Sequence, residues 1–192
     1  MEILTGLDIE VDDEVYVPSD DTFLLIELLQ LEGNERVLEI GCGSGFISLH
    51  CASIGCETTS VDISEMALEN TLYNAKINNL KINTKVSDMF SKLSGRWDII
   101  IFNPPYLPKE KAFDQDLRWD GGKRGDEIVV RFLSKAHNYL KKGGSIYLIY
   151  SDRSPLNKIE NIIDEKYTLL KKSSQTFSFE TIYAVKLLRD FD

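Results

Sequence analysis

A short apolar run that leads directly into a glycine-rich loop is the feature that most limits the possible folds of this chain. The run Arg36–Ile40 (RVLEI) predicts a buried strand, and the loop GCGSG follows it with glycines at positions 41, 43 and 45. Glycines there allow a sharp turn and a close approach of the backbone to a ligand, and they present amide groups at the start of a helix predicted over residues 46–54. This order predicts the first unit of an α/β sheet with a ligand site beyond its strand ends.

Predicted helices and strands alternate along most of the chain. Further helices are predicted over residues 19–31 and 65–78, from Asp126 to the KKGG sequence at 141–144, and from Ser154 onwards. Further strands are predicted over residues 58–61, 82–86, 97–102 and 145–150, followed by a hairpin over 167–175 and 179–187. We therefore predict a mostly parallel α/β sheet with helices on both faces and a C-terminal antiparallel hairpin. The helix at 65–78 is predicted to bury an apolar stripe made by Met66, Leu68, Leu72, Ala75 and Ile77.

Length and composition are those of a single globular domain. The 192 residues are 43% hydrophobic and 28% charged, which predicts one domain over 1–192, with an acidic segment and helix over 1–35 and a core over 36–192. No apolar run approaches the ~18 residues needed to cross a bilayer, and the acidic start differs from a signal peptide, so a cytoplasmic location is expected. Three cysteines and two histidines without paired spacing predict no metal site.

The net charge of −9 is concentrated at the start of the chain. Residues 1–36 contain 11 acidic residues and one basic residue, a net of −10, which leaves +1 for the remaining residues. Proteins that hold nucleic acid through its phosphates usually carry a basic excess. The charge distribution therefore makes a nucleic-acid partner less expected without excluding it.

Acidic residues follow the second and third predicted strands. Asp62, in VDIS, could accept hydrogen bonds from the vicinal hydroxyls of a ribose, or it could cap the next helix. Asp88, in SDMF, could accept a hydrogen bond from an adenine amine while Met89 offers its backbone amide, or it could be an ordinary loop residue. Both readings stay open for each residue on these signals alone.

The sequence NPPY follows directly after the strand predicted over 97–102. Pro104 and Pro105 end the strand and stiffen the backbone, which fixes the Asn103 side chain and the Pro104 carbonyl as two hydrogen-bond acceptors beside the Tyr106 ring. Two acceptors and an aromatic face suit a planar NH2 group, whose nitrogen can then be held toward a methylsulfonium. We therefore predict that Asn103, Pro104, Pro105 and Tyr106 form the catalytic segment.

Taken together, these motifs resemble class I S-adenosylmethionine-dependent methyltransferases that act on amino nitrogens. GCGSG is similar to their glycine motif, and NPPY is similar to their (D/N)PP(Y/F/W) motif. The segment YVPSDDTFLLIELL at 16–29 is similar to the YxPxxDTxLL segment of HemK-related glutamine methyltransferases, and the chain is most similar to their short archaeal and eukaryotic branch. The resemblance covers nearly the whole chain and implies a seven-stranded Rossmann-like sheet.

The resemblance also implies a reaction and a set of site residues. It implies methylation, by S-adenosylmethionine, of the glutamine side chain in the GGQ motif of a peptide-chain release factor. It implies that substrate could contact Arg118, Lys123 and Arg124, which a solvated loop explains equally well. The residues that would contact or frame the cofactor are Thr22, Glu39, Gly41, Gly43, Gly45, Asp62, Ile63, Asp88, Met89 and Asn103.

Other functions stay open on the sequence. NPPY also occurs in enzymes that methylate an exocyclic amine of a DNA or RNA base, and a protein lysine is a third acceptor. A non-catalytic scaffold is the alternative from a different class, and the intact glycine loop, Asp62 and Asn103 argue against it.

A partner is expected at one edge of the sheet. The strand at 82–86 is predicted to lie at this edge, flanked by Lys81 and Lys85, with an apolar surface from Leu80, Ile82, Val86, Met89 and Phe90. The short branch typically works with a small zinc-binding activator subunit that extends the sheet here, so the resemblance implies a heterodimer, with any zinc held by the partner. A soluble monomer protected by its edge lysines is the alternative.

Overall fold

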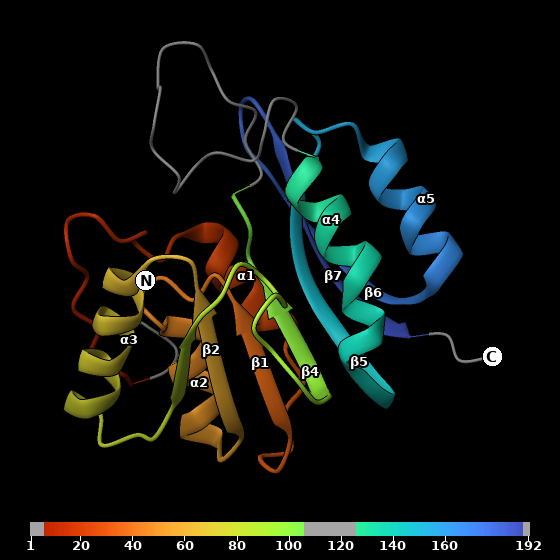
Figure 1. The fold of residues 1–192 in the computed structure, drawn as a ribbon. Helices are drawn as coiled ribbons and strands as arrows, with labels where there is room; N and C mark the ends of the chain where they lie inside the picture. Colours follow the sequence, from red (N-terminus) through yellow and green to blue (C-terminus); the bar gives the residue numbers. More distant parts are fainter. Residues whose placement is uncertain (1–5, 106–125, 190–192) are drawn as a thin grey trace.

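The computed structural model of the protein describes residues 6–105 and 126–189. These residues form a seven-stranded sheet in the order β3-β2-β1-β4-β5-β7-β6 (Figure 1). Strands β1 to β5 run parallel to one another, whereas β7 lies antiparallel between β5 and β6. The predicted parallel sheet with a C-terminal antiparallel hairpin is therefore confirmed. The strands are β1 (Arg36–Ile40), β2 (Glu57–Asp62), β3 (Asn83–Val86), β4 (Trp97–Phe102), β5 (Leu140–Ser151), β6 (Tyr167–Thr176) and β7 (Thr181–Arg189).

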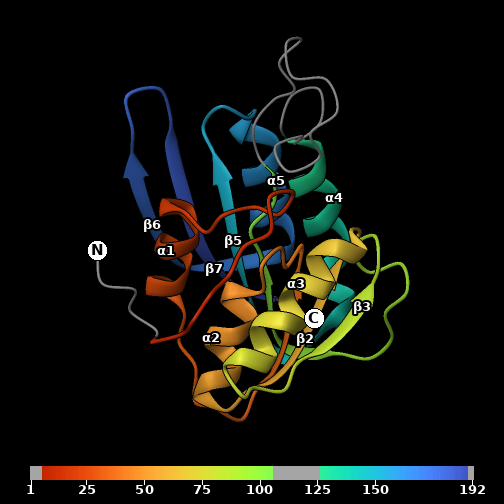
Figure 2. The same cartoon turned by 90° about the vertical axis from the view of Figure 1, so that its left-hand side faces the viewer.

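Helices cover both faces of this sheet (Figures 1 and 2). On one face lie α1 (Asp20–Leu28), α2 (Phe46–Ile54) and α3 (Glu65–Ile77), and on the other lie α4 (Glu127–Ala136) and α5 (Leu156–Lys166), with a short 3-10 turn η1 (His137–Tyr139) after α4. Because successive strand residues point to opposite faces, Val37 joins the core under α1 and α2 while Leu38 joins the core under α4 and α5. Within the described residues, no helix is both long and apolar enough to span a membrane.

The KKGG sequence lies in a strand, which corrects the prediction that it ends a helix. The helix α4 stops at Ala136, and β5 already begins at Leu140, which is fully buried opposite Trp97. Between Trp97 and Ile99 the register shifts from Leu140 to Ser145, so two steps along β4 match five along β5. Gly143 has φ +76 in this bulge, a conformation that glycine adopts without strain. The lysines and glycines therefore mark a β-bulge rather than a helix end.

Polar side chains make up much of the buried face of α3, where an apolar stripe was predicted. Met66 and Leu72 are exposed, whereas Asn70, Thr71 and Asn74 are buried together with Ala67, Leu68 and Ala75. The predicted stripe is therefore wrong at Met66 and Leu72. The reason is that this face packs against the N-terminal backbone and the glycine loop, whose peptide groups require hydrogen-bond partners.

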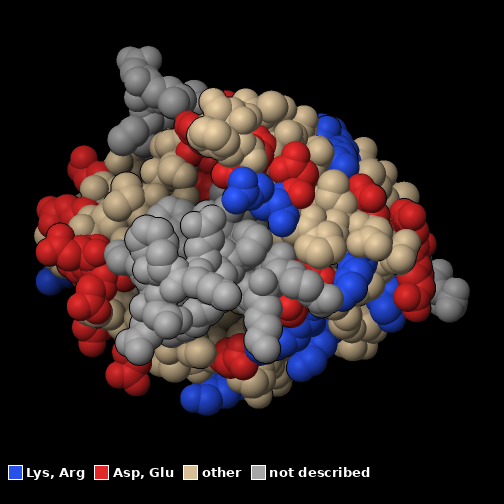
Figure 3. Space-filling model, turned by 90° about the horizontal axis from the view of Figure 1, so that it is seen from above, with Lys and Arg blue, Asp and Glu red and all other residues tan. Residues whose placement is uncertain are grey.

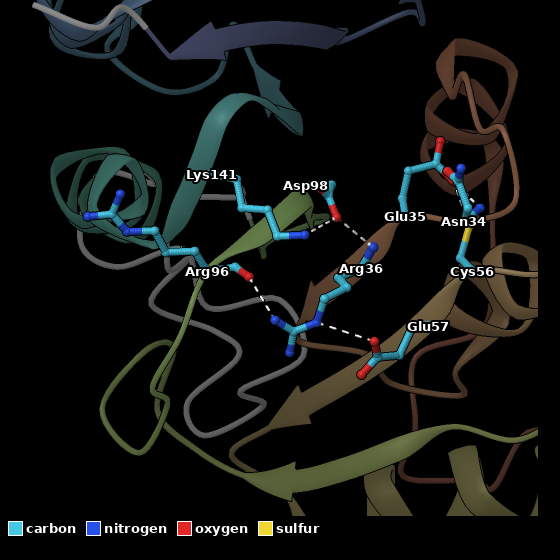
Figure 4. Close-up of polar contacts among 8 residues, drawn as sticks. All are labelled: Asn34, Glu35, Arg36, Cys56, Glu57, Arg96, Asp98 and Lys141. Carbon is cyan, nitrogen blue, oxygen red and sulfur yellow. Dashed lines mark hydrogen bonds and ion pairs between the residues drawn. The ribbon is translucent and has the colours of Figure 1, made fainter.

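A polar cluster joins the strands at their amino ends (Figure 4). Asp98 accepts hydrogen bonds from the Arg36 backbone amide at 2.9 Å and from Lys141 Nζ at 2.7 Å, which links β4 to β1 and β5. Burial alone would raise the pKa of Asp98, but these donors outweigh it and lower the pKa below its usual value. Arg36 also pairs with Glu57 of β2 at 3.3 Å. These contacts link the amino ends of four strands. Ligands of open α/β sheets bind at the opposite edge, beyond the carboxyl ends of the strands.

Candidate functional site

A cavity of about 760 Å³ lies at the carboxyl ends of the central strands. Its wall includes the last residues of β1 and β2 and the residues that follow β4. The strand order reverses at β1, which lies between β2 and β4, and ligands bind at such a switch point in open α/β sheets. Of the predicted site residues, the cavity wall contains Thr22, Glu39, Gly41, Gly43, Asp62, Ile63, Asp88, Met89, Asn103 and Pro105.

The glycine loop combines an exposed backbone with a tightly packed helix start. Gly41 and Gly43 line the cavity with φ of +67 and +53. Gly45 is not among the cavity-lining residues and serves a different purpose. It caps α2 with φ +80, and a Cβ there would lie 2.7 Å from Thr71 Cγ2 of α3. Glycine is therefore required at position 45 so that α2 can pack on α3.

Asp62 faces the glycine loop from the end of β2. Its Oδ2 accepts a hydrogen bond from the Gly43 amide at 3.1 Å, and its Oδ1 accepts one from the Ser64 amide at 2.9 Å. A carboxylate oxygen has a second acceptor site, so each oxygen can still receive a hydroxyl from a ligand in the cavity. Asp62 can thus hold the glycine loop through Gly43 and bind a pair of ligand hydroxyls at the same time.

The turn after β3 brings Asp88 and Met89 to the cavity. Asp88 is half-exposed and pairs with Arg131 of α4, a cavity-lining cation that the sequence did not reveal. Met89 has φ +48, an uncommon conformation for a residue other than glycine, and its side chain is buried in the core with Phe90. Met89 and Phe90 therefore do not belong to an exposed apolar edge, which corrects that part of the expected partner surface. The reason is that both side chains fill the core under α4.

Asn103 follows β4 directly, and its two side-chain atoms have different surroundings. The Nδ2 donates to Asp21 Oδ2 at 3.2 Å and to Thr22 Oγ1 at 3.4 Å. The Oδ1 is buried and has no hydrogen-bond partner among the described residues. Pro104 is buried behind the cavity wall, and Pro105 lines the cavity. The Nδ2 of Asn103 is therefore bonded within the protein, whereas its Oδ1 is an acceptor without a described partner.

Residues 8–18, here called the N-terminal strap, cross α3 and reach the cavity. Asn70, Asn74 and Asn78 accept from the amides of alternate strap residues, Asp12, Glu10 and Asp8, at 3.4, 3.0 and 2.9 Å. Side chains four residues apart on a helix are about 6 Å apart along the axis, close to two residues of extended chain, so the two spacings match. The spacing of these asparagines is the sequence signal that could have revealed the strap.

The strap contributes Val15, Tyr16 and Pro18 to the cavity wall. The Tyr16 hydroxyl donates to Asp21 Oδ1 at 2.8 Å, and burial together with the Asp21 charge raises the pKa of Tyr16 well above its ordinary value. The wall of the cavity is therefore built partly by a segment with no regular secondary structure. Sequence reasoning placed no site residue in this part of the wall.

Glu39 is a buried carboxyl group at the end of β1. Its Oε2 accepts from the Ser48 amide at 2.9 Å and from the Ser48 hydroxyl, which in turn contacts Ser60 at 2.5 Å. Burial raises the pKa of Glu39 to about 8 despite these hydrogen bonds, and the nearby Asp62 charge adds to the rise.

Four predicted residues, Tyr106, Arg118, Lys123 and Arg124, lie outside the described residues. No group of three or more potential metal ligands occurs in the part of the chain that is described.

The sequence matches a known family along most of its length. The model of the family described as "Methyltransferase small domain" matches residues 19–182. The chain belongs to this methyltransferase family. A provisionally named protein N5-glutamine methyltransferase of Methanocaldococcus jannaschii is 40% identical over 166 residues, which cover 82% of this chain and 84% of that protein. The release factor glutamine methyltransferase of Streptococcus pneumoniae is 38% identical over 157 residues, which cover 74% of this chain and 56% of that enzyme.

Solved structures share the fold of this methyltransferase. A methyltransferase from Pyrococcus furiosus has a TM-score of 0.79 and 25% identity, covering 98% of this chain and 92% of that one. The Mtq2 protein of E. cuniculi, solved in complex with Trm112 and described as responsible for methylation of the eRF1 termination factor, has a TM-score of 0.69 and 23% identity. That match covers 92% of this chain and 99% of the other. These likenesses agree with the expected HemK-related class I methyltransferase fold.

Proposed function

We propose that this methyltransferase transfers a methyl group from S-adenosylmethionine to the side-chain nitrogen of the glutamine in the GGQ motif of a peptide-chain release factor. The single observation that carries the proposal is the buried, unpartnered Asn103 Oδ1 at the carboxyl end of β4. It is an acceptor aimed at no described protein group, on the wall of a cavity that also holds the glycine loop and Asp62. The family and the names of its relatives support the choice of acceptor.

The cavity residues fit S-adenosylmethionine in size and chemistry. A volume of about 760 Å³ lies within the usual range for small-molecule sites. Asp62 would accept the ribose hydroxyls, Asp88 and the Met89 amide would meet the adenine, and the glycine loop would lie against the amino-acid part. When bound, the cofactor supplies an electrophilic methyl group on a positively charged sulfur. The residues of the chain then have to orient the acceptor nitrogen toward that methyl group.

Asn103 can perform this orientation. Its Oδ1 and the Pro104 carbonyl would accept hydrogen bonds from the two N–H groups of the substrate amide, which would turn the nitrogen lone pair toward the methyl carbon. As the N–C bond forms and the S–C bond breaks, the nitrogen gains positive charge, so these two hydrogen bonds strengthen in the transition state. The electron pair of the broken S–C bond would stay on sulfur as a neutral thioether, and the surplus proton on nitrogen would pass to water.

The surface beside the cavity favours a protein acceptor over nucleic acid. Figure 3 shows acidic side chains gathered on the side of the N-terminal strap and α3. The strap contributes the exposed residues Asp8, Glu10, Asp12, Asp13 and Glu14, and Glu14 also lines the cavity. Phosphates would be repelled there, whereas a basic protein segment would be attracted.

We infer that residues 1–192 act as one catalytic domain in the cytoplasm, where translation factors work.

The deciding experiment is labelled methyl transfer from S-adenosylmethionine onto release factor, tRNA, rRNA and DNA in parallel. Mass spectrometry then identifies the methylated atom. We expect label on the release-factor glutamine alone. Label on nucleic acid or on a lysine would overturn the proposed acceptor while leaving the methyltransferase activity in place.

Replacement of Asp62 tests the cofactor site. Asp62→Ala should weaken S-adenosylmethionine binding by about 1.5–3 kcal/mol, the usual loss for hydrogen bonds to a charged group, which is about 10–150-fold in Kd. Asp62→Asn, which keeps one acceptor oxygen for the loop, should lie between this variant and the wild type. Isothermal titration calorimetry gives the affinities, and an unchanged Kd in the alanine variant would contradict the ribose role.

We also propose that a small zinc-binding activator subunit pairs with β3. This strand lies at the edge of the sheet, and its neighbour α3 exposes Met66, Leu72 and Tyr73. Leu80 and Ile82 remain partly exposed next to the strand. An exposed strand edge beside an apolar helix surface suits extension of the sheet by a partner. The Mtq2 protein, which shares this fold, was solved in complex with a second protein, Trm112.

A matched pair of variants tests this interface. Leu72 on α3 and Leu169 on β6, at the opposite edge of the sheet, are each 46% exposed. Leu72→Glu should weaken a pull-down of the activator at least tenfold, because the new charge would be buried in the interface, whereas Leu169→Glu should have no effect. A fully active monomer whose turnover does not rise with added activator would refute the heterodimer.

A further inference from the structure

Asn103 lines the cavity and turns its nitrogen rather than its oxygen to a neighbouring carboxylate, whose chemistry explains why. Asp21 is 3% exposed, and its Oδ2 lies 3.2 Å from Asn103 Nδ2. An ionised carboxylate can only accept hydrogen bonds. If the Asn103 amide were turned by 180°, its oxygen would face the Asp21 oxygen, and two acceptors would meet without a hydrogen between them. The side chain of Asn103 is therefore held in the one orientation that directs Oδ1 away from Asp21.

Asp21 is itself fixed by neighbouring donors. Its Oδ1 accepts from the Tyr16 hydroxyl at 2.8 Å, the Ser19 hydroxyl at 2.9 Å and the Thr22 amide at 2.6 Å. The Tyr16 donor belongs to the N-terminal strap, while Ser19 and Thr22 belong to the start of α1. These donors all approach Oδ1, which leaves Oδ2 directed at Asn103.

We propose that Asp21 is a positioning residue that locks the Asn103 amide with its oxygen toward the methyl acceptor, and so restricts the enzyme to acceptors that bring an N–H group. This inference deepens the proposed function and rests on it for the identity of the acceptor. Asp21 acts through Asn103, because it is buried and is not among the residues that line the cavity. The lock raises the rate by keeping the acceptor geometry ready before substrate binds.

An exchange of the two side chains tests the lock. In Asp21→Asn, an amide at position 21 would place a donor against Asn103 Nδ2, so the Asn103 amide should turn and present its NH2 to the substrate NH2. We expect turnover at saturating S-adenosylmethionine to fall about 100-fold or more, because misplaced reacting groups cost rates of this order. The Kd for S-adenosylmethionine should stay within about threefold. In Asn103→Asp, two carboxylates would face each other, and turnover should fall similarly.

Combining both substitutions should restore the arrangement. The amide at position 21 would then donate to the carboxylate at position 103, whose second oxygen faces the cavity again. We expect the combined variant to exceed the slower single variant by at least tenfold. If the two substitutions were independent structural defects, their losses of turnover would multiply. A combined variant no faster than the slower single variant would therefore overturn the proposal. Asp20→Asn removes the same charge from the same helix turn and should change turnover less than about twofold.

A spectroscopic readout keeps the test independent of folding and of the substrate. The Asn103 side-chain NH2, assigned in the wild type by its nuclear Overhauser contacts with Thr22, should exchange slowly with solvent. Fast exchange would overturn the proposal even if no variant folds. If the wild type methylates a different N–H acceptor, the proposed function fails, yet the same variants measured on that acceptor still decide the role of Asp21.

Discussion

Replacing Asn103 by alanine is expected to lower turnover about 10³-fold or more while leaving the Kd for S-adenosylmethionine within a few fold. Asn103 Oδ1 is buried and lacks a partner among the described residues, so its hydrogen bond would be made only with a ligand. Removing one oriented transition-state hydrogen bond costs about 10²–10³-fold in other enzymes, and loss of the lone-pair alignment adds to this. Single-turnover rates with the release factor and calorimetry with the cofactor measure the two quantities separately.

The combination of a large rate effect and a small binding effect is what identifies an acceptor-binding role. If Asn103→Ala weakened cofactor binding as strongly as turnover, the side chain would serve mainly as part of the cofactor pocket. A variant that kept more than a tenth of the wild-type turnover would contradict the role altogether. Thermal unfolding of the variant is the control, since Asn103 also donates to Asp21 and Thr22.

The sequence predicted the central strands well because their signals are local. RVLEI and WDIIIF are short apolar runs, and both ends of each strand were placed correctly; the glycines and prolines that follow mark the carboxyl ends. The KKGG sequence misled because glycine and lysine also mark helix ends, and only the pairing with β4 reveals the bulge. The buried face of α3 misled for a related reason, since its asparagines are partnered by backbone from residues about 60–70 positions earlier.

Residues predicted directly after strands lie together on the wall of one cavity, and their roles stay predictions. Asp62 and Asn103 were named because the carboxyl ends of parallel strands meet at one edge, whereas Glu39 was implied only by the family resemblance. Asp21 and Arg131 were missed because their contacts with Asn103 and Asp88 join segments far apart in the sequence. Gly45 belongs to the same motif as Gly41 and Gly43, yet only the distance to Thr71 shows that it is needed for helix packing. Spacing alone cannot separate these two uses of glycine.

The stability of the cofactor-free protein is expected to fall as the pH rises from about 5 to about 8, because of Glu39. Burial raises the pKa of Glu39 to about 8, far above that of an unfolded chain. Between these values the folded state holds a proton that the unfolded state has lost, so raising the pH favours unfolding. The contribution is fully present below pH 4.5 and is lost as the pH passes 8. Its size is on the order of 5 kcal/mol, at about 1.4 kcal/mol for each pH unit between these values.

Glu39→Gln isolates this contribution, because glutamine keeps the shape and an acceptor for the Ser48 amide but cannot ionise. Urea unfolding between pH 5 and 9 should give a falling free energy of unfolding for the wild type relative to the variant. The two proteins should be similar near pH 5, and the variant should be more stable by several kcal/mol above pH 8. The half-buried histidines His50 and His137, whose pKa values are lowered by desolvation, change stability in the opposite direction with pH but equally in both proteins. Parallel curves for the two proteins would show that Glu39 is already ionised in the fold, held by Ser48 against its burial.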